Sequence, residues 1–279
     1  MNLQNKTVSI LGCGWLGLPL AKFLIEHKND VKGSSTSPDK LSLLESNGIK
    51  PYLIRLDPEP KCEKEELEDF LSSEILIINI PPGTRKNPGS DYHVRQMQGL
   101  APFLKDSPLR KVVYISSTSV YPDLDKIVQE GDLADKNQAG NKVLFDAEQI
   151  ILSISQEAVV LRCGGLTGYD RILVNYFAGK TNLSGGNNPV NLIHRDDLVR
   201  IVSEVCAKHG LNKVYNVCAP GHPLRKIYYP HIAKKLGMQE PQYKEEDASG
   251  YKLIEGSLLQ KELDYKFLYP DPMTFDFQP

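Results

Sequence analysis

Several features that would place this 279-residue chain in a specialised class of protein are missing from its sequence. No apolar run approaches the ~20 residues that a membrane-spanning helix needs. The opening segment MNLQNKTVSILG lacks the long apolar core and the cleavage site of a secretion signal. The formal net charge is -2, with the basic residues scattered, so the chain offers no basic field for nucleic acid or membrane. We expect a cytoplasmic protein that binds neither.

Cysteine and histidine are scarce and irregularly placed. The six histidines are dispersed, without the H-x-x-x-H or mixed Cys/His spacing that metal sites use, so we expect no bound metal. No two cysteines form a C-x-x-C pair, and we expect them to be reduced, mostly buried thiols. The five cysteines are Cys13, Cys62, Cys163, Cys206 and Cys218.

What the sequence does contain is an alternation of short β-rich runs and helical patterns. In residues 16–27, for example, Leu16, Leu20 and Leu24 recur at helical spacing. Several of the β-rich runs are apolar nearly throughout, as expected for strands that are covered on both faces. The alternation predicts an α/β fold with a parallel, doubly wound Rossmann-type sheet. The expected strands are 7–12, 30–35, 49–55, 74–80, 111–117, 157–163 and 213–219.

The regular alternation weakens after residue 163, where Gly, Pro, Asn and Tyr become more frequent. A chain of this length can hold one large domain or one domain with a smaller lobe. We predict that residues 1–166 with 188–219 form the Rossmann domain. We predict that 167–187 with 220–279 form a small substrate-side lobe at the carboxyl edge of the sheet, where such folds bind ligands.

The first expected strand leads directly into GCGWLG, in which Gly12, Gly14 and Gly17 have G-x-G-x-x-G spacing. Gly12 would permit a tight turn, Gly14 would let a pyrophosphate approach the backbone, and Gly17 would allow close helix–strand packing. The motif follows a strand and opens an amphipathic helix, so it predicts a dinucleotide site that includes Trp15 and Leu16. The alternative is a glycine-rich turn without a ligand.

The end of the second expected strand bears on the choice of cofactor. A NAD site would place an acid about 20 residues after the glycines, to bind the ribose hydroxyls. Here Ser35, Thr36 and Ser37 occupy that region. With Lys40 they could accept a 2′-phosphate, which favours NADP over NAD. A Ser or Thr cap on a helix that starts near Pro38 is the alternative, and both could hold.

Three further segments are candidates for contact with the cofactor or a ligand. Asp57 ends the third expected strand, where an acid can receive an adenine amino group, although Pro58 after it also suits a turn. Pro81, Pro82 and Gly83 follow the fourth strand and are expected on the ribose side of the cofactor. The polar loop 83–93 could close over a ligand. Its basic side chains, expected to be solvated or to meet a phosphate, are Arg85 and Lys86.

With the run VVYISSTSVY added to the segments above, the chain resembles the extended short-chain dehydrogenase/reductases, the group that includes nucleotide-sugar epimerases and dehydratases. The resemblance covers essentially the whole chain, and its motifs are specific for the superfamily only when taken together. The motifs are GCGWLG, INIPPG, YISSTSVY, VLRCGGLTGYDR, NLIHRDDLVRIV, VYNVCAP and SLLQKELDYKFLYP.

The resemblance implies roles for particular residues. Ser117 occupies the position that hydrogen-bonds the reacting oxygen of the substrate, and Asp197 is expected to cap the helix after it. The residues it places beside the cofactor are Ser116, Gly164, Gly165 and Leu166. Those on the substrate side are Tyr169, Arg171 and His194, the last at a position that is more often structural than catalytic.

The superfamily's catalytic Tyr-x-x-x-Lys pair is missing. The pair supplies a proton donor and a lysine that lowers the pKa of the tyrosine toward neutrality. The expected helix over 136–152 should carry it, but no tyrosine lies between Tyr121 and Tyr169. Counting back from AEQ at 147–149 places Gly140 at the tyrosine position and Leu144 at the lysine position.

Other groups could take over proton transfer. In a slipped register the four-spaced pair becomes Gln138 and Lys142, and Lys142 could lie near the cofactor, although a surface lysine is the commoner outcome. Tyr121 is the nearest tyrosine, at a position that is usually structural in the superfamily. Neither residue restores the missing pair.

The sequence supports two hypotheses of function. The first is an NAD(P)-dependent oxidoreductase or epimerase/dehydratase-like enzyme with a degenerate active site, acting on a sugar-like or nucleotide-linked small molecule. The second is a non-catalytic NAD(P)-binding redox sensor or regulatory protein. The missing pair favours the second, whereas Ser117 and the polar loops at the carboxyl edge favour the first. A homodimer is also compatible with the sequence. We favour the enzyme, chiefly by analogy of fold.

Overall fold

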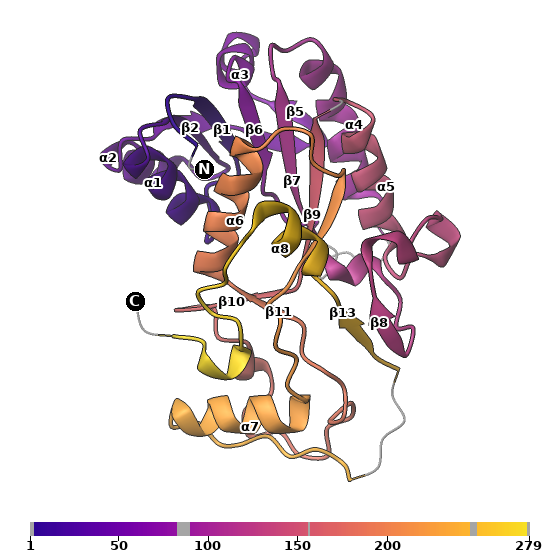
Figure 1. Cartoon of the computed structure of the whole chain (residues 1–279). Helices are drawn as coiled ribbons and strands as arrows, with labels where there is room; N and C mark the ends of the chain where they lie inside the picture. Colours follow the sequence, from indigo (N-terminus) through magenta and orange to yellow (C-terminus); the bar gives the residue numbers. More distant parts are fainter. Residues whose placement is uncertain (1–2, 83–89, 156, 246–249, 278–279) are drawn as a thin grey trace. The chain divides into compact units, whose positions relative to one another are not determined.

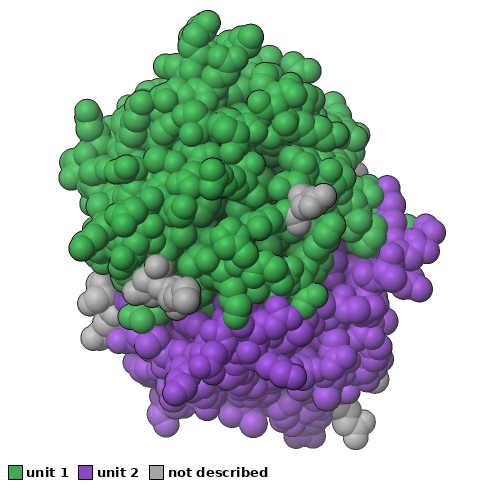
Figure 2. Space-filling model, turned by 45° about the horizontal axis from the view of Figure 1, so that its top comes forward, with its two compact units in different colours: residues 1–116, 141–161, 199–215 green, residues 117–140, 162–198, 216–279 purple. Residues whose placement is uncertain are grey.

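Residues 3–82, 90–155, 157–245 and 250–277 are described by the computed structural model of the chain (Figure 1). The chain divides into two compact units, which Figure 2 shows in different colours. Unit 1 comprises residues 1–116, 141–161 and 199–215, and unit 2 comprises residues 117–140, 162–198 and 216–279. No helix within the described ranges is long and apolar enough to cross a lipid bilayer.

Unit 1 is built on a seven-stranded sheet with the strand order β12-β9-β7-β6-β1-β2-β3. The neighbouring pairs β3–β2, β2–β1, β1–β6 and β6–β7 are parallel. The chain moves outward from β1 to β3 and then crosses back to β6, so the strand order reverses beside β1. The strands are β1 (Thr7–Leu11), β2 (Asp30–Ser35), β3 (Lys50–Leu53), β6 (Ile75–Ile78), β7 (Lys111–Ser117), β9 (Ala158–Cys163) and β12 (Val214–Val217).

Helices cover both faces of this sheet (Figure 1). On one face, α3, α4 and α5 share a core with alternate strand residues such as Leu76 and Ile78. On the other face lie α1 and α6, where the Arg200 guanidinium is 5.9 Å from the centre of the Phe23 ring. The helices and the remaining short elements of this part are α1 (Gly17–Glu26), η1 (Pro38–Lys40), α2 (Leu41–Ser46), β4 (Arg55–Asp57), β5 (Glu59–Lys61), α3 (Lys64–Leu71), α4 (Tyr92–Lys105), α5 (Lys142–Leu152) and α6 (Arg195–Ala207).

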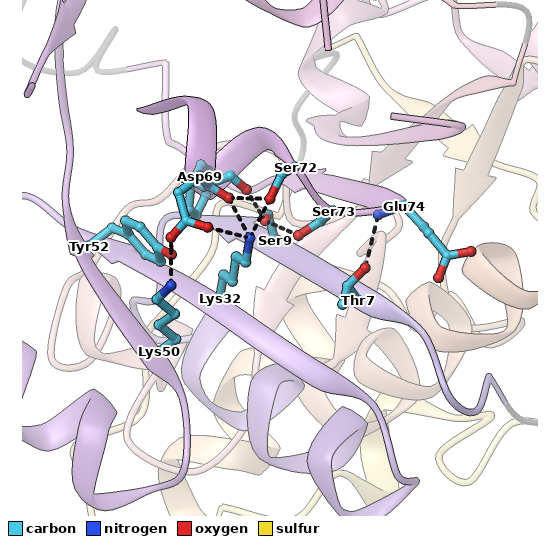
Figure 3. Close-up of polar contacts among 10 residues, drawn as sticks. Thr7, Ser9, Lys32, Lys50, Tyr52, Asp69, Ser72, Ser73 and Glu74 are labelled. Carbon is cyan, nitrogen blue, oxygen red and sulfur yellow. Dashed lines mark hydrogen bonds and ion pairs between the residues drawn. The ribbon is translucent and has the colours of Figure 1, made fainter. Parts of the chain in front are cut away.

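A polar cluster around Asp69 connects α3 to strands β2 and β3 of the sheet (Figure 3). The Asp69 carboxylate accepts hydrogen bonds from the Tyr52 hydroxyl and from the Lys50 ammonium, the latter at 2.5 Å. The Lys32 ammonium lies 3.3 Å from the same carboxylate and donates to the Ser72 hydroxyl at 2.8 Å. These donors, led by Lys50, hold the pKa of Asp69 well below its usual range.

Unit 2 contains short strands paired across long stretches of sequence. β10 (Gly165–Thr167) pairs in parallel with β11 (Leu192–His194), and β8 (Lys126–Val128) pairs in parallel with β13 (Lys252–Ile254). A separate apolar core gathers around Tyr228 and Phe275. The other elements of this unit are η2 (Thr118–Val120), η3 (Glu130–Asp132), η4 (Lys136–Gln138), η5 (Leu173–Tyr176), α7 (Arg225–Lys235), α8 (Ser257–Leu263) and η6 (Pro272–Thr274).

The predicted Rossmann-type α/β fold is confirmed, and all seven expected strands are present within two residues of their predicted ends. The division into units differs from the predicted domains, because residues 162–166, 188–198, 216–219 and, as the longest segment, 117–140 group with unit 2. The pairing of β8 with β13 gives the reason, since it joins that segment to the end of the chain.

Two predictions about helix starts are wrong. The helix expected over 136–152 begins only at Lys142, where the Asn141 side chain caps it by accepting a hydrogen bond from the Leu144 amide at 3.1 Å. Asp197 does not cap α6, because the helix already begins at Arg195. Instead, its buried carboxylate accepts hydrogen bonds from the Tyr265 hydroxyl and from two backbone amides at 268 and 269.

Candidate dinucleotide site

A pocket of about 520 Å³ lies in unit 1 at the carboxyl ends of β1, β2 and β6. The strand order reverses beside β1, and ligands bind at such switch points in open α/β sheets. The volume is in the range of small-molecule pockets. The lining residues are Leu11, Gly12, Cys13, Gly14, Ser34, Ser35, Thr36, Lys40, Ile54, Arg55, Leu56, Asn79, Ile80, Pro81 and Gln96.

The three glycines of the first loop have different steric surroundings. Gly12 has φ +103°, and a Cβ there would lie 2.5 Å from the Asn79 carbonyl oxygen. A Cβ at Gly17 would lie 2.3 Å from the Gly12 carbonyl oxygen. A Cβ at Gly14, in contrast, would meet no atom within 4 Å. Gly12 and Gly17 are therefore needed for packing, whereas Gly14 borders open space in the pocket.

The loop is held in place by the ends of the two neighbouring strands. The Gly12 amide donates to the Ser34 hydroxyl at 3.0 Å, and the Cys13 amide donates to the Ser34 carbonyl at 2.8 Å. On the other side, the Asn79 side-chain amide donates to the Gly12 carbonyl at 3.0 Å. Trp15 directly follows Gly14, the last lining residue of this loop, and Leu16 is the N-cap residue of α1. These bonds fix the loop before any ligand contacts it.

The hydroxyl groups at the end of β2 are only partly available to a ligand. The Ser35 hydroxyl accepts a hydrogen bond from the Ser37 amide at 3.0 Å and lies 3.2 Å from the Ser37 carbonyl. Ser37 precedes η1, but its side chain forms no capping hydrogen bond. Thr36 is exposed and lines the pocket. The Ser/Thr helix cap considered from the sequence is therefore not formed, and the Ser35 hydroxyl closes the turn before η1.

The pocket rim near β2 carries positive charge without a matching acid. Lys40 and Arg55 both line it, and none of its lining side chains among the described residues is acidic. The Arg55 guanidinium donates to the Thr36 carbonyl at 3.4 Å. Sequence reasoning missed Arg55, because it sought a partner for the 2′-phosphate only after β2. The parallel pairing of β2 with β3 was the signal, since it brings the chain after β3 beside the chain after β2.

Asp57 and the segment Pro81–Pro82 differ in whether they line the pocket. Asp57 lies in β4 rather than at the end of β3, because β4 turns at Pro58 into the antiparallel strand β5. Its carboxylate accepts a hydrogen bond from the Tyr92 hydroxyl at 2.8 Å, and it is not a lining residue of the pocket. Pro81 lines the pocket, whereas Pro82 does not. Gly83, Arg85 and Lys86 lie outside the described residues.

Behind the pocket, a buried relay supports Gln96. The Gln96 side-chain amide donates to the Leu56 carbonyl at 2.9 Å, and its oxygen lies 3.2 Å from His93 Nδ1. Nδ1 must therefore carry the proton, so that Nε2 accepts from the Tyr114 hydroxyl at 2.6 Å. Burial lowers the pKa of His93, which keeps the ring neutral. The relay thus gives Gln96 one orientation at the pocket wall.

Ser116 and Ser117, at the end of β7, have separate environments. Ser116 is buried, and its hydroxyl donates to the Glu148 carboxylate of α5 at 2.6 Å. Ser117 is half-buried, and its hydroxyl accepts the Ser119 amide at 3.2 Å as the cap of η2. The Ser117 hydroxyl hydrogen is therefore not used in that bond and remains a donor for a ligand.

Tyr121 lies inside unit 2 rather than at its surface. Its side chain is 1% exposed. The hydroxyl donates to the Asn216 side-chain oxygen at 2.8 Å and accepts from the Arg162 guanidinium at 2.8 Å. These bonds give Tyr121 a structural role. Its hydroxyl would have to break the hydrogen bond to Asn216 before it could donate its proton to a ligand.

The positions aligned with the catalytic pair are closed to the missing side chains. Gly140 lies outside α5, and a Cβ there would lie 2.7 Å from the Tyr121 carbonyl oxygen and 2.9 Å from Pro122. Leu144 is 1% exposed, so a lysine in its place would be buried. In the slipped register, Gln138 ends η4 and Lys142 is the exposed first residue of α5.

The remaining predicted site residues lie in unit 2. Gly164 packs closely, since a Cβ there would lie 2.8 Å from the Asn191 carbonyl oxygen. Gly165 and Leu166 belong to β10. Arg171 is exposed, and its carbonyl accepts from the Thr167 hydroxyl at 2.9 Å.

Tyr169 and His194 belong to one aromatic cluster in unit 2. Tyr169 has φ +52°, which is unusual for a bulky residue. Its ring centre lies 5.4 Å from that of the fully buried His194, and its hydroxyl donates to Asp196. Burial and this carboxylate raise the pKa of Tyr169 to about 12, so it is a weak acid at neutral pH.

No group of three or more His, Cys, Asp or Glu side chains that could hold a metal ion occurs within the part of the chain that the structure describes. The polar groups at the carboxyl edge of unit 1 are instead suited to hydrogen bonding and to holding an anion.

Comparison with known proteins identifies the family. No protein-family model matches the chain. Protein YeeZ of Escherichia coli K12 is 33% identical over 275 residues, which cover 98% of this chain and 100% of YeeZ. The chain belongs to the YeeZ family.

Solved structures confirm the fold of this YeeZ-family protein. A conserved protein of unknown function from Silicibacter pomeroyi matches with a TM-score of 0.76 and 20% identity, covering 97% of this chain and 96% of its own. UDP-glucuronic acid 4-epimerase from Bacillus cereus, in complex with UDP-glucuronic acid and NAD, matches with a TM-score of 0.75 and 15% identity. That match covers 97% of this chain and 98% of the epimerase. The predicted Rossmann-type α/β fold is thus confirmed.

Proposed function

We propose that this YeeZ-family protein binds a nicotinamide dinucleotide in the unit 1 pocket and uses it as an epimerase/dehydratase-like oxidoreductase. The observation that carries the proposal is the steric difference among the glycines. Gly12 and Gly17 are packed against backbone, whereas Gly14 faces open space at the amino end of α1. A diphosphate fits such a place, because the positive end of a helix faces it.

The residues of the pocket would share the binding. The backbone at Gly14 and the start of α1 would hold the pyrophosphate, and the wall formed by Ile54 and Leu56 would contact the adenosine. Trp15 and Leu16 would shape the loop. The cofactor, when bound, would supply hydride transfer. Further predicted cofactor contacts are Ser35, Thr36, Ser37, Pro81, Ser116, Gly164, Gly165 and Leu166, whereas Asp57 and Pro82 do not line the pocket and are not proposed as contacts.

NADP is our preferred cofactor because of the residues that this chain carries at the pocket rim. The epimerase from B. cereus is complexed with NAD, so its likeness does not favour the phosphorylated form. However, none of the described residues that line the rim after β2 is acidic, and a carboxylate in the lining would bind the ribose hydroxyls of NAD and repel a 2′-phosphate.

For the substrate we propose a nucleotide-linked or otherwise sugar-like molecule. Ser117 would donate its free hydroxyl hydrogen to the reacting oxygen, and Tyr169, Arg171 and His194 would lie on the substrate side. Proton transfer would fall to another group or to water, because Tyr121 is engaged in the interior. Lys142, exposed at the start of α5, is the remaining protein candidate.

A non-catalytic NAD(P) sensor is the second candidate function. The observation that favours it is the packing at Gly140, which leaves no room for the catalytic tyrosine. A sensor would bind the cofactor and change conformation or partner without turning over a sugar nucleotide.

Titration with NADP(H) and NAD(H), followed by Trp15 fluorescence and by melting temperature, tests the cofactor proposal. We expect quenching and stabilisation, since a ligand that binds only the folded state raises its stability. No response to either cofactor at millimolar concentration would refute dinucleotide binding. Incubation of the cofactor-loaded protein with UDP-glucose and UDP-glucuronic acid, followed by NMR of the sugar, then separates the enzyme from the sensor.

A further inference from the structure

The pairing of β2 with β3 fixes the positions of the residues that come directly after these two strands. Ser35 pairs with Leu53 in the parallel register, and the Ile54 amide donates to the Ser35 carbonyl at 3.1 Å. The next residues, Thr36 and Arg55, must therefore also be neighbours. The Arg55 guanidinium donates to the Thr36 carbonyl at 3.4 Å, which holds it at the rim of the pocket.

Among the residues that the structure describes, no acidic side chain forms an ion pair with the positive charge at this rim. Arg55 and Lys40 are exposed lining residues, and neither forms an ion pair with another described residue. The carboxylate nearest in sequence to Arg55 is Asp57, which accepts from the Tyr92 hydroxyl and does not line the pocket. Two cations beside an open pocket without acidic lining residues point to an anionic ligand group.

The Ser35 hydroxyl, at the end of β2, is less available to bind that anion. The Ser35 hydroxyl is already engaged with the Ser37 amide and carbonyl inside the turn. A guanidinium binds a phosphate through two parallel hydrogen bonds, whereas an ammonium acts as a point charge. Arg55 is therefore the main candidate to bind a phosphate at this rim, and Lys40 is the second.

We propose that Arg55, assisted by Lys40, binds the 2′-phosphate on the adenosine ribose and determines the choice of NADP over NAD. The proposal rests on the proposed dinucleotide function and deepens it, because Arg55 comes from the chain after β3 and not from the loop after β2. The ligand group is a phosphate monoester, so adenosine 2′,5′-bisphosphate carries the recognised chemistry without the nicotinamide half.

Calorimetric titration of Arg55→Gln, Lys40→Gln and the double variant with NADP(H), NAD(H) and adenosine 2′,5′-bisphosphate tests the proposal. For Arg55→Gln we expect roughly a tenfold or greater loss of affinity for the two 2′-phosphorylated ligands, as for other charged hydrogen bonds. Affinity for NAD(H) should change by less than about threefold. Arg55→Lys should recover part of the loss, because it restores the charge but not the paired hydrogen bonds.

Lys22→Gln is the matched control, since Lys22 is an exposed cation on α1 that does not line the pocket. It should leave all three affinities unchanged. Three results would overturn the role of Arg55 while leaving dinucleotide binding intact: a wild-type preference for NAD, an unchanged NADP preference in the double variant, or equal losses for NAD and NADP. Absence of binding to both cofactors by the folded wild type would instead refute the proposed function itself.

Discussion

Gly140 lies against the backbone of Tyr121, such that a Cβ at position 140 would be 2.7 Å from the Tyr121 carbonyl oxygen. The Gly140 amide also donates to the Val120 carbonyl at 2.9 Å. The position that we predict to align with the superfamily's tyrosine therefore has backbone atoms where a side chain would begin. Any larger residue at position 140 would collide with this backbone unless the backbone moved.

Gly140→Ala should lower the free energy of unfolding by about 1–3 kcal/mol, the usual cost of forcing an atom into a packed site. Gly131→Ala is the matched control, because a Cβ at Gly131 would meet no atom within 4 Å. We expect that control to be neutral within about 0.5 kcal/mol. Urea denaturation of both variants measures the difference, and an equal effect of the two would contradict the packing argument.

Two glycines of the first loop should separate folding from cofactor binding. Gly17→Ala should destabilise the protein without any ligand, since its Cβ would be 2.3 Å from the Gly12 carbonyl oxygen. Gly14→Ala should leave the melting temperature of the ligand-free protein nearly unchanged, because its Cβ meets open space. The added methyl of Gly14→Ala would instead obstruct the pyrophosphate, and we expect about a tenfold or greater loss of NADP(H) affinity. Unimpaired binding by this variant would count against the phosphate site.

Ser117→Ala should reduce turnover of a sugar nucleotide by about 10²–10³, if Ser117 holds the reacting oxygen as a preorganised donor. The cofactor dissociation constant should stay within about twofold, because the change lies outside the pocket of unit 1. Ser117→Thr keeps the hydroxyl and the cap of η2, and it serves as the control. Full activity in the alanine variant would remove Ser117 from the mechanism.

The Asp69 cluster should make the free energy of unfolding decrease at acidic pH. The folded-state pKa of Asp69 is lowered by Lys50 and Tyr52, so the unfolded state binds more protons in the window between the two pKa values. Its contribution is therefore complete at neutral pH and is lost as the pH falls below about 4, toward the folded-state value.

Comparison of Asp69→Asn with the wild type over this range tests the expectation. The variant should be less stable by about 1 kcal/mol at pH 7, a modest value because the carboxylate is 44% exposed and screened. The gap should narrow in acid. Asp30→Asn is a suitable control, since exposed Asp30 forms no ion pair with another described residue. A gap that does not change with pH would rule out the ionic origin.

The sequence predicted the sheet well because the strands are marked by local patterns. A run such as ILII at 75–78 is apolar throughout, as expected for a strand that is covered on both faces. The glycine spacing was equally local, and the structure shows the tight turn at Gly12 and the close packing at Gly17. In both cases, the residues that determine the local structure are close to one another in the sequence.

The features that sequence reasoning missed depend on partners far along the chain. Arg55 reaches the pocket only because β3 pairs with β2, and Asn79 supports the loop from the end of β6. Asp197 looked like a helix cap, yet its carboxylate binds groups some 70 residues later in sequence, at Tyr265 and beyond. Gly140 looked like a helical position, but the Asn141 cap starts the helix after it.

The interleaving of the two units has a consequence for the study of their separate stabilities. The chain passes from one unit to the other after residues 116, 140, 161, 198 and 215. No single cleavage of the polypeptide yields either unit intact, and a fragment ending at any of these points strands a β-segment or a helix without its neighbours. Limited proteolysis should accordingly give nicked but still associated material rather than a separable domain.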